Sequence, residues 1–169
     1  MDPKITIRPA RVEDAEKILA YSKQIGSETD FLLFGAEGLP FTLAQEQMFL
    51  AKTEKSATGC MLAALYEDEI IGLCSFEANI RYRIAHHGSI SISLLKKYWG
   101  KGIAKELMMQ GIEFARKLGM EIITLEVNSD NHRAIGLYER LGFEKFGTFK
   151  RSFKVNEEYS DTDYMALYL

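Results

Sequence analysis

Residues 94–107, LLKKYWGKGIAKEL, join two segments of different periodicity. The residues before the join, GSISISLL (88–95), alternate serine with isoleucine or leucine, which predicts a strand. Residues 102–118 repeat apolar side chains at helical spacing and are followed by Gly119, which predicts a helix with a glycine at its end. Gly100 and Gly102 lie between the two. The stretch therefore predicts a strand that passes into a helix through a glycine turn.

This turn is suited to bind an anion. The first N–H groups of a helix have no partner inside the helix, and the helix dipole adds partial positive charge there. Phosphate commonly binds at such a terminus, and glycine lets it approach the backbone. Lys96, Lys97, Lys101 and Lys105 add positive charge nearby. A bare pair of glycines is equally compatible with a tight turn that binds nothing.

Two familiar phosphate motifs do not fit the turn. A Walker loop requires G-x-x-x-x-G-K-[S/T], whereas Lys101 is followed by Gly102 and has no earlier glycine at the required position. A dinucleotide-binding fingerprint opens the first β–α unit of a doubly wound sheet, whereas this turn lies past the middle of the chain. The anion would belong to a different class of site.

The rest of the chain predicts an α/β domain over residues 1–169, with one central mixed sheet. Residues 88–127 should form a right-handed parallel crossover. The loop 27–41 is long enough to be a substrate lid. The expected strands are 4–10, 58–66, 69–79, 88–95, 121–127, 143–153 and 161–168, and the expected helices are 12–26 (ending at Gly26), 42–53 (with a Thr42/Gln45 capping box), 102–118 and 131–142.

Composition limits the class of protein. A net charge of −3 weighs against a non-specific nucleic-acid binder. No stretch approaches the roughly 20 apolar residues of a membrane span, and the first residues are too polar for a signal peptide. Cys60 and Cys74 lie in adjacent predicted strands, where we expect free buried thiols rather than a disulfide. These features predict a soluble cytoplasmic protein.

A second motif, ITLEVNSDNHRAIGLYERLGF (123–143), gives the glycine turn a context. Together with WGKGIAKEL (99–107), it resembles the GNAT superfamily of acyl-CoA-dependent N-acetyltransferases, in particular relatives that acetylate ribosomal proteins and small amines. The N-terminal IRPARVEDAEKIL (7–19) is similar to the family's opening. The resemblance implies a mixed, mostly antiparallel sheet of about seven strands with helices on both faces, and acetyl-CoA as co-substrate with no metal.

The resemblance also implies which residues contact the co-substrate. The family pattern Q/R-x-x-G-x-G/A corresponds here to residues 99–104, with Trp99 at the position of the family's charged or amide side chain. The indole N–H of Trp99 can still donate one hydrogen bond, and its ring can pack over the co-substrate or under the helix. The implied contacts are Ile92, Leu94, Leu95, Trp99, Gly100, Lys101, Gly102, Ile103, Ala104, Asn131, Ala134 and Tyr138.

Acetyl transfer needs a base, an acid and a donor for the oxyanion. Glu126 interrupts an apolar strand and is the expected base, with Glu77 as the alternative. The structural alternative is that Glu126 is a strand-end glutamate in solvent or in a salt bridge with Arg133. The resemblance implies Tyr138 as the acid near the sulfur, although it also reads as a core tyrosine. A backbone N–H near Leu94 or Leu95 is the implied oxyanion donor.

Several matters stay open in the sequence. His86 and His87 have no third ligand at a suitable spacing, so we expect no metal there. Phe31, Phe34 and Phe41 either line an acceptor pocket or pack in the core. The expected function is acetyl transfer to a primary amine, such as a protein N-terminus, a polyamine or an amino acid, without nucleic acid or membrane. A non-catalytic acyl-CoA-binding or regulatory module is the alternative, and the family makes a homodimer one expected assembly.

Overall fold

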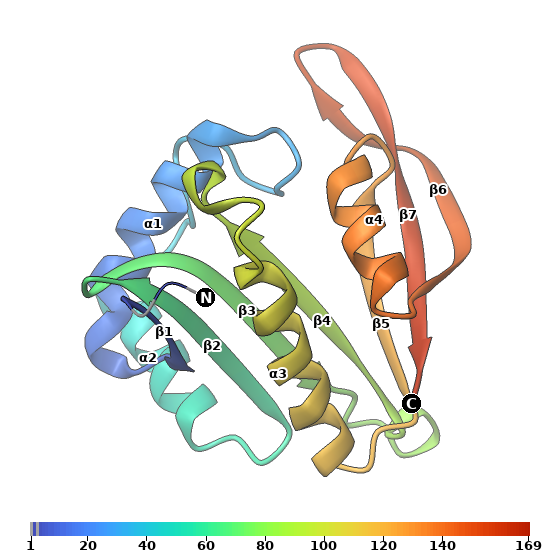
Figure 1. Ribbon diagram of the computed structural model, residues 1–169, viewed down its shortest axis with the longest axis horizontal. Helices are drawn as coiled ribbons and strands as arrows, with labels where there is room; N and C mark the ends of the chain where they lie inside the picture. The colour runs from blue at the N-terminus through green and yellow to red at the C-terminus, as the bar shows by residue number, and fades with distance from the viewer. Residues whose placement is uncertain (1, 3) are drawn as a thin grey trace.

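The computed structural model describes residue 2 and residues 4–169, and a single seven-stranded sheet runs through it (Figure 1). The strand order is β1-β2-β3-β4-β5-β7-β6, and every neighbouring pair is antiparallel except β4–β5. This confirms the expected mixed, mostly antiparallel sheet. The strands are β1 (Ile5–Pro9), β2 (Gly59–Tyr66), β3 (Glu69–Ala78), β4 (His87–Leu94), β5 (Ile122–Asn128), β6 (Glu144–Val155) and β7 (Glu158–Tyr168).

Helices cover both faces of the sheet, as expected. They are α1 (Ala15–Glu28), α2 (Leu43–Glu54), α3 (Ile103–Lys117) and α4 (His132–Arg140). On one face, a Cβ on Gly111 of α3 would lie 2.8 Å from Ile90 of β4. On the other face, the Tyr21 hydroxyl of α1 donates to Ser93 Oγ at 2.9 Å. Because Ile90 and Ser93 alternate along β4, α3 and α1 lie on opposite sides. Figure 1 shows α3 and α4 crossing in front of the sheet.

Local sequence signals explain most element boundaries. The capping box of α2 is formed, with Thr42 N–H donating to Gln45 Oε1 at 2.8 Å and Gln45 N–H donating to Thr42 Oγ1 at 3.3 Å. Gly119 and Gly142 take positive φ angles of 75° and 92° just after α3 and α4. Within the described residues no helix is long and apolar enough to cross a membrane.

Gly26 was expected to end the first helix, and this was wrong. Helix α1 continues to Glu28. The residue is glycine because the following loop packs against it: a Cβ on Gly26 would lie 1.9 Å from the carbonyl oxygen of Gly35. The glycine therefore fixes where the loop 27–41 lies, rather than where the helix stops.

The last two strands are longer than expected. They are joined directly by Asn156 and Glu157, whose φ angles of 47° and 68° fit the two-residue turns that connect twisted hairpins. Arg151, with φ 56°, lies in a break of register between Phe149 and Phe153. Cys60 and Cys74 are free thiols, as expected, although only Cys74 is fully buried and Cys60 is half-buried. Burial raises the pKa of Cys60 to about 11 and that of Cys74 to about 12.

The β4–β5 pairing is short. Only His87–Ile122, Gly88–Ile123 and Ser89–Thr124 are in register. Beyond these residues β4 stays paired to β3 as far as Leu94, and β5 stays paired to β7 as far as Asn128. Figure 1 shows the two strands side by side near the C-terminus and diverging away from it. The sheet is therefore open along the second half of both strands.

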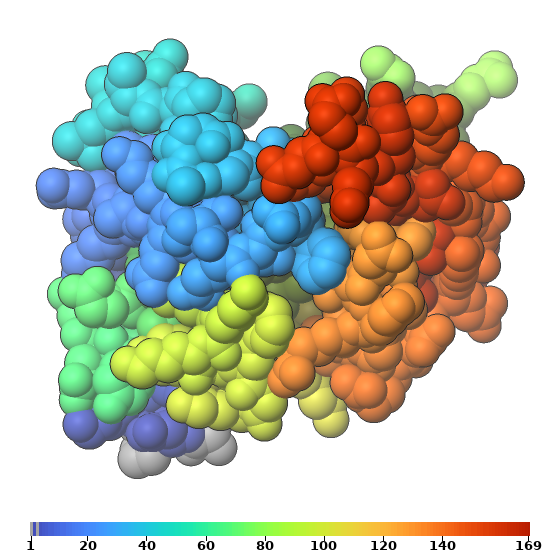
Figure 2. All heavy atoms as spheres, turned by 90° about the horizontal axis from the view of Figure 1, so that it is seen from above, coloured from blue at the N-terminus to red at the C-terminus, as the bar shows by residue number. Residues whose placement is uncertain are grey.

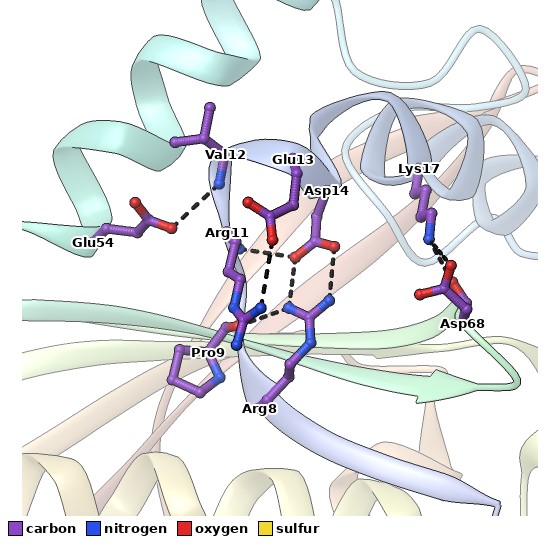
Figure 3. A network of polar contacts seen from close by, with 9 residues as sticks. All are labelled: Arg8, Pro9, Arg11, Val12, Glu13, Asp14, Lys17, Glu54 and Asp68. Carbon is purple, nitrogen blue, oxygen red and sulfur yellow. Dashed lines mark hydrogen bonds and ion pairs between the residues drawn. The ribbon is translucent and has the colours of Figure 1, made fainter.

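An ion pair joins β1 to the start of α1 (Figure 3). Arg8 donates from both terminal nitrogens to the Asp14 carboxylate at 2.7 and 2.8 Å, and Arg11 N–H donates to the same carboxylate at 2.8 Å. Asp14 is only 2% exposed. The hydrogen bonds from Arg8 hold the pKa of the Asp14 carboxyl below its ordinary value of 3.8. A lowered pKa in the folded state means that the charged carboxylate stabilises the fold.

We expect Asp14→Asn to lower the free energy of unfolding by about 2–3 kcal/mol at neutral pH, because Arg8 loses its charged partner. The difference between the variant and the parent should shrink as the pH falls below 3.8 and through the folded-state pKa, where Asp14 takes up a proton. Urea unfolding at several pH values measures both effects. Glu13→Gln is the control: its partner contact with Arg11 is exposed, so a change under about 0.5 kcal/mol is expected. Equal losses for the two variants would contradict the assignment.

Candidate active site

A cleft of about 1270 Å³ lies where β4 and β5 separate. Figure 2 shows this hollow between α1 and the residues before α3 on one side, and α4 with the β6–β7 hairpin on the other. Because the sheet is open here, side chains from both faces of the sheet line the cleft. Ordinary small-molecule pockets hold roughly 300–1,000 Å³, so this cleft has room for two ligands.

The end of β4 presents backbone groups to the cleft. Leu95 N–H donates to the carbonyl oxygen of Ile71, near the start of β3, at 3.0 Å. In an antiparallel ladder alternate residues turn their N–H and C=O groups to opposite sides, so the N–H groups of Ile92 and Leu94 point toward β5. The described β4–β5 ladder ends at the pair Ser89–Thr124, so it does not reach Ile92 or Leu94. Leu95 does not line the cleft and its N–H is used within the sheet, which leaves Ile92 and Leu94 as the residues with donors in the gap.

The glycine turn opens onto the same cleft. A short 3₁₀ turn, η3 (Lys96–Tyr98), leads from β4 to Gly100 and Gly102, whose φ angles are 75° and 82°. A Cβ on Gly102 would meet no atom within 4 Å, so the space above the turn is open. The N–H groups of residues 100–105 have no backbone partner among the described residues. A row of free donors at a helix N-terminus fits a diphosphate group.

Trp99 connects this turn to the strand. Its indole N–H donates to the carbonyl oxygen of Leu94 at 2.7 Å. The Arg133 guanidinium lies 5.0 Å from the centre of the indole ring, a cation–π arrangement. An Arg133 terminal nitrogen is 3.6 Å from the position of a Cβ on Gly100. Where the family pattern suggested by the sequence has glutamine or arginine at position 99, this chain has tryptophan, and Arg133 places a positive charge next to the turn.

Sequence reasoning weighed Arg133 only as a partner for Glu126 and missed this position. The one signal was an aromatic residue where a charged one was expected, which leaves a ring available to hold a cation. Of the nearby lysines, Lys105 lines the cleft. Lys101 does not, because its amino group lies 5.1 Å from the Tyr98 ring, although its backbone belongs to the turn.

Helix α4 contributes the second motif. The Asn131 side chain caps the helix by accepting from Ala134 N–H at 3.2 Å, and both residues line the cleft. Tyr138 follows two turns later on the same side of the helix and also reaches the cleft. It is 6% exposed, and its hydroxyl has no hydrogen-bond partner among the described residues. Burial raises the pKa of this phenol, so it is protonated at neutral pH.

The opposite face of the sheet is polar. Glu77 pairs with Ser89, and Ser89 pairs with Thr124, so these side chains share one face. By alternation the same face carries Glu126, two residues after Thr124. We call this set the serine face; its members, which all line the cleft, are Ser75, Glu77, Ser89, Ser91, Ser93, Thr124 and Glu126. Ile90 alternates with Ser89 and Ser91 along β4, and α3 packs on Ile90. The serine face is therefore the face of the sheet opposite α3 and α4.

Both glutamates of the serine face are exposed in the cleft. Neither forms an ion pair with a described residue. In particular, the salt bridge between Glu126 and Arg133 that the sequence allowed is not formed, because Arg133 lies against Trp99. Glu77 and Glu126 are therefore free to interact with a ligand.

Two segments wall the serine side of the cleft. Phe31 and Phe34 of the loop 27–41 line it, whereas Phe41 is exposed and does not. The β6–β7 hairpin contributes Phe153 and Tyr164, which sequence reasoning did not single out. The rings of His86 and His87 lie 5.1 Å apart outside the cleft. The described residues contain no group of three or more His, Cys, Asp or Glu side chains with metal-site geometry.

Comparison with known proteins places the chain in a family. A profile of the Acetyltransferase (GNAT) family matches residues 29–143. The L-amino acid N-acetyltransferase of Escherichia coli is 33% identical over 106 residues, which cover 62% of this chain and 65% of that protein, just under two thirds. The L-methionine sulfoximine/L-methionine sulfone acetyltransferase of Pseudomonas aeruginosa is 28% identical over 167 residues, 97% of this chain and 94% of that protein.

A solved structure is similar over nearly the whole length. The crystal structure of a GNAT-family acetyltransferase from Streptococcus pneumoniae superposes with a TM-score of 0.93 at 29% identity, covering 98% of this chain and 99% of that one. The sheet order, the glycine turn and the profile match agree with one another. The chain belongs to the Acetyltransferase (GNAT) family of acetyl-CoA-dependent N-acetyltransferases.

Proposed function

We propose that the chain transfers an acetyl group from acetyl-CoA directly to a primary amine. One observation carries the proposal: the gap between β4 and β5 joins a free phosphate-binding turn and a buried tyrosine on one face to unpaired carboxylates on the other. Each substrate would occupy one face, and their reacting groups would meet in the gap. When bound, acetyl-CoA supplies the activated acetyl carbon and a thiolate leaving group.

The α3 face suits the co-substrate. The N–H groups of residues 100–105, with Arg133 and Lys105 beside them, would hold the diphosphate. The N–H groups of Ile92 and Leu94 would bind amide oxygens of the pantetheine arm, as a neighbouring strand does. Leu95, which the family resemblance also implied, has its N–H bonded to Ile71 and contributes packing only.

Three groups of the chain would handle the chemistry. Glu126 accepts a proton from the amine, whose reference pKa of about 10.4 keeps it charged at neutral pH. As the N–C bond forms, Leu94 N–H donates to the oxygen on which negative charge develops. As the C–S bond breaks, Tyr138 donates its phenolic proton to the sulfur and regains one from solvent.

The activity is tested by following thiol release from acetyl-CoA over a panel of amines and peptides, with the acetylated product identified by mass. Turnover with any primary amine supports acetyl transfer. Tight binding of acetyl-CoA with no turnover over the whole panel would instead support the non-catalytic binding module.

Tyr138→Phe should lower kcat about 100-fold, because general acids typically contribute at least that factor, while KM for acetyl-CoA changes little. Steady-state kinetics with the best amine measures both constants. Tyr66→Phe is the control, since Tyr66 packs against Tyr98 and lies outside the cleft. If kcat of Tyr138→Phe stays near the parent value, the phenol is only a packing residue.

Glu126→Gln should lower kcat about 100-fold at neutral pH, and raising the pH should restore part of the loss by deprotonating free amine. Glu77→Gln is compared in the same assay. A greater loss of kcat in Glu77→Gln than in Glu126→Gln would move the base to Glu77.

Trp99→Ala should weaken acetyl-CoA binding about tenfold, because it removes a cation–π contact and the hydrogen bond to Leu94, together about 1–2 kcal/mol. Arg133→Gln should weaken binding by a similar factor. If Trp99 acts by holding Arg133, the double variant loses less than the sum of the two single losses. Calorimetric titration gives the three dissociation constants, and fully additive losses would show that the two residues act separately.

A further inference from the structure

The acceptor half of the cleft carries an unbalanced charge. The serine face presents Glu77 and Glu126, neither paired, and none of its members is cationic. Among the described residues, the cationic side chains that line the cleft are Lys105, Arg133 and Arg140. All three belong to α3 and α4, on the opposite face. A ligand on the serine face therefore meets negative charge without a positive counterpart.

The cations of the neighbouring hairpin do not change this balance. Lys154 pairs with Glu157 at 2.8 Å and lies 5.4 Å from the Tyr159 ring. Arg151 lies 4.1 Å from the same ring. Lys145 pairs with Asp163. Each of these three has a partner of its own, and Lys150 of the same hairpin has no ion-pair partner among the described residues. None of the four lines the cleft.

The walls of this half of the cleft are aromatic. Rings from three segments line it: Tyr21 from α1, Phe31 and Phe34 from the loop 27–41, and Phe153 and Tyr164 from the hairpin. Tyr138, more than nine-tenths buried, reaches the same cleft from α4 on the opposite side, so a ligand on the serine face has its reacting group directed toward the gap. Aromatic faces attract cations and exclude water, so they reinforce the preference that the carboxylates set.

The two glutamates stand at a useful separation. Glu77 is directly opposite Ser89, Ser89 is opposite Thr124, and Glu126 is two residues further along β5. Two strand spacings of about 4.8 Å and two residues of about 3.3 Å place their Cα atoms at least about 12 Å apart, because β5 diverges from β4 beyond Thr124. With both side chains extended toward one ligand, the second carboxylate reaches a group several bonds away from the reacting nitrogen.

We propose that the acceptor is a small alkyl diamine or polyamine without a free carboxylate, and that Glu77 binds its second, non-reacting ammonium group. The inference rests on the proposed acetyl transfer and specifies its substrate class. It differs from what the names of the Escherichia coli and Pseudomonas aeruginosa relatives say, since an amino acid brings a carboxylate. Here that carboxylate would face Glu77 and Glu126 with no cation to pair it.

Matched amines separate the two parts of the proposal. L-Lysine and 1,5-diaminopentane differ only by the carboxylate, and 1-aminopentane lacks only the second ammonium group. We expect kcat/KM for 1,5-diaminopentane to exceed that for each of the other two by at least about tenfold, as one desolvated charge contact provides. Glu77→Gln should reduce the diamine-to-monoamine ratio of kcat/KM about tenfold. Glu69→Gln, the same change at the far end of β3 and outside the cleft, should leave the ratio intact.

Binding measured by calorimetry on the CoA-saturated protein provides a readout independent of turnover. Tighter binding of the diamine than of the monoamine, weakened in Glu77→Gln, supports the inference even without catalysis. No acetylation of any amine overturns the proposed function alone. If L-lysine is bound and acetylated as well as 1,5-diaminopentane, the substrate class is overturned while the transferase stands. An unchanged diamine-to-monoamine ratio in Glu77→Gln overturns the role of Glu77.

Discussion

The separation of β4 and β5 is the constraint on which the cleft depends. Three register pairs hold these parallel strands together, and each strand then follows its other neighbour. Helix α3 packs over β3 and β4, while α4 packs on the other half of the sheet and its end meets Leu167 of β7 through Gly142. Within the described residues, no helix bridges the opening. The result is a passage between the two faces, edged by strand backbone whose hydrogen-bonding groups are not used within the sheet.

A single side chain links the glycine turn to this edge. Trp99 bonds to the last carbonyl of β4 and carries Arg133 from the start of α4 on its ring. The strand end, the glycine turn and α4 are thereby held in one arrangement across the mouth of the cleft. Tryptophan at this position cannot supply the charge that an arginine would, but its ring holds the guanidinium of Arg133 beside the turn. The substitution in the family pattern is compensated by a residue more than thirty positions away in the sequence.

Most of the fold could be predicted because it follows from local patterns. The serine–isoleucine alternation of β4, the Thr42/Gln45 cap and the glycines after α3 and α4 each act within a few residues. What could not be predicted depends on contacts between distant segments. Gly26 looked like a helix end because its partner, Gly35, is visible only in three dimensions. Arg133 and the hairpin aromatics were missed for the same reason. The side to which the Leu95 N–H points depends on how β4 pairs with β3, and this N–H bonds to Ile71 rather than facing the gap.

The walls of the cleft come from separate parts of the chain. The glycine turn and α4 line one face, whereas the loop 27–41 and the β6–β7 hairpin enclose the other. Neither of these two segments contributes a backbone group to the turn. Evolution can therefore alter the loop and the hairpin without disturbing the opposite wall, so that one half of the cleft drifts while the other is held constant. That freedom ends where the loop is tied to α1. Gly35 packs against Gly26, and Leu39 N–H donates to Ser22 Oγ at 3.1 Å, so diversification is confined to loop residues away from these contacts.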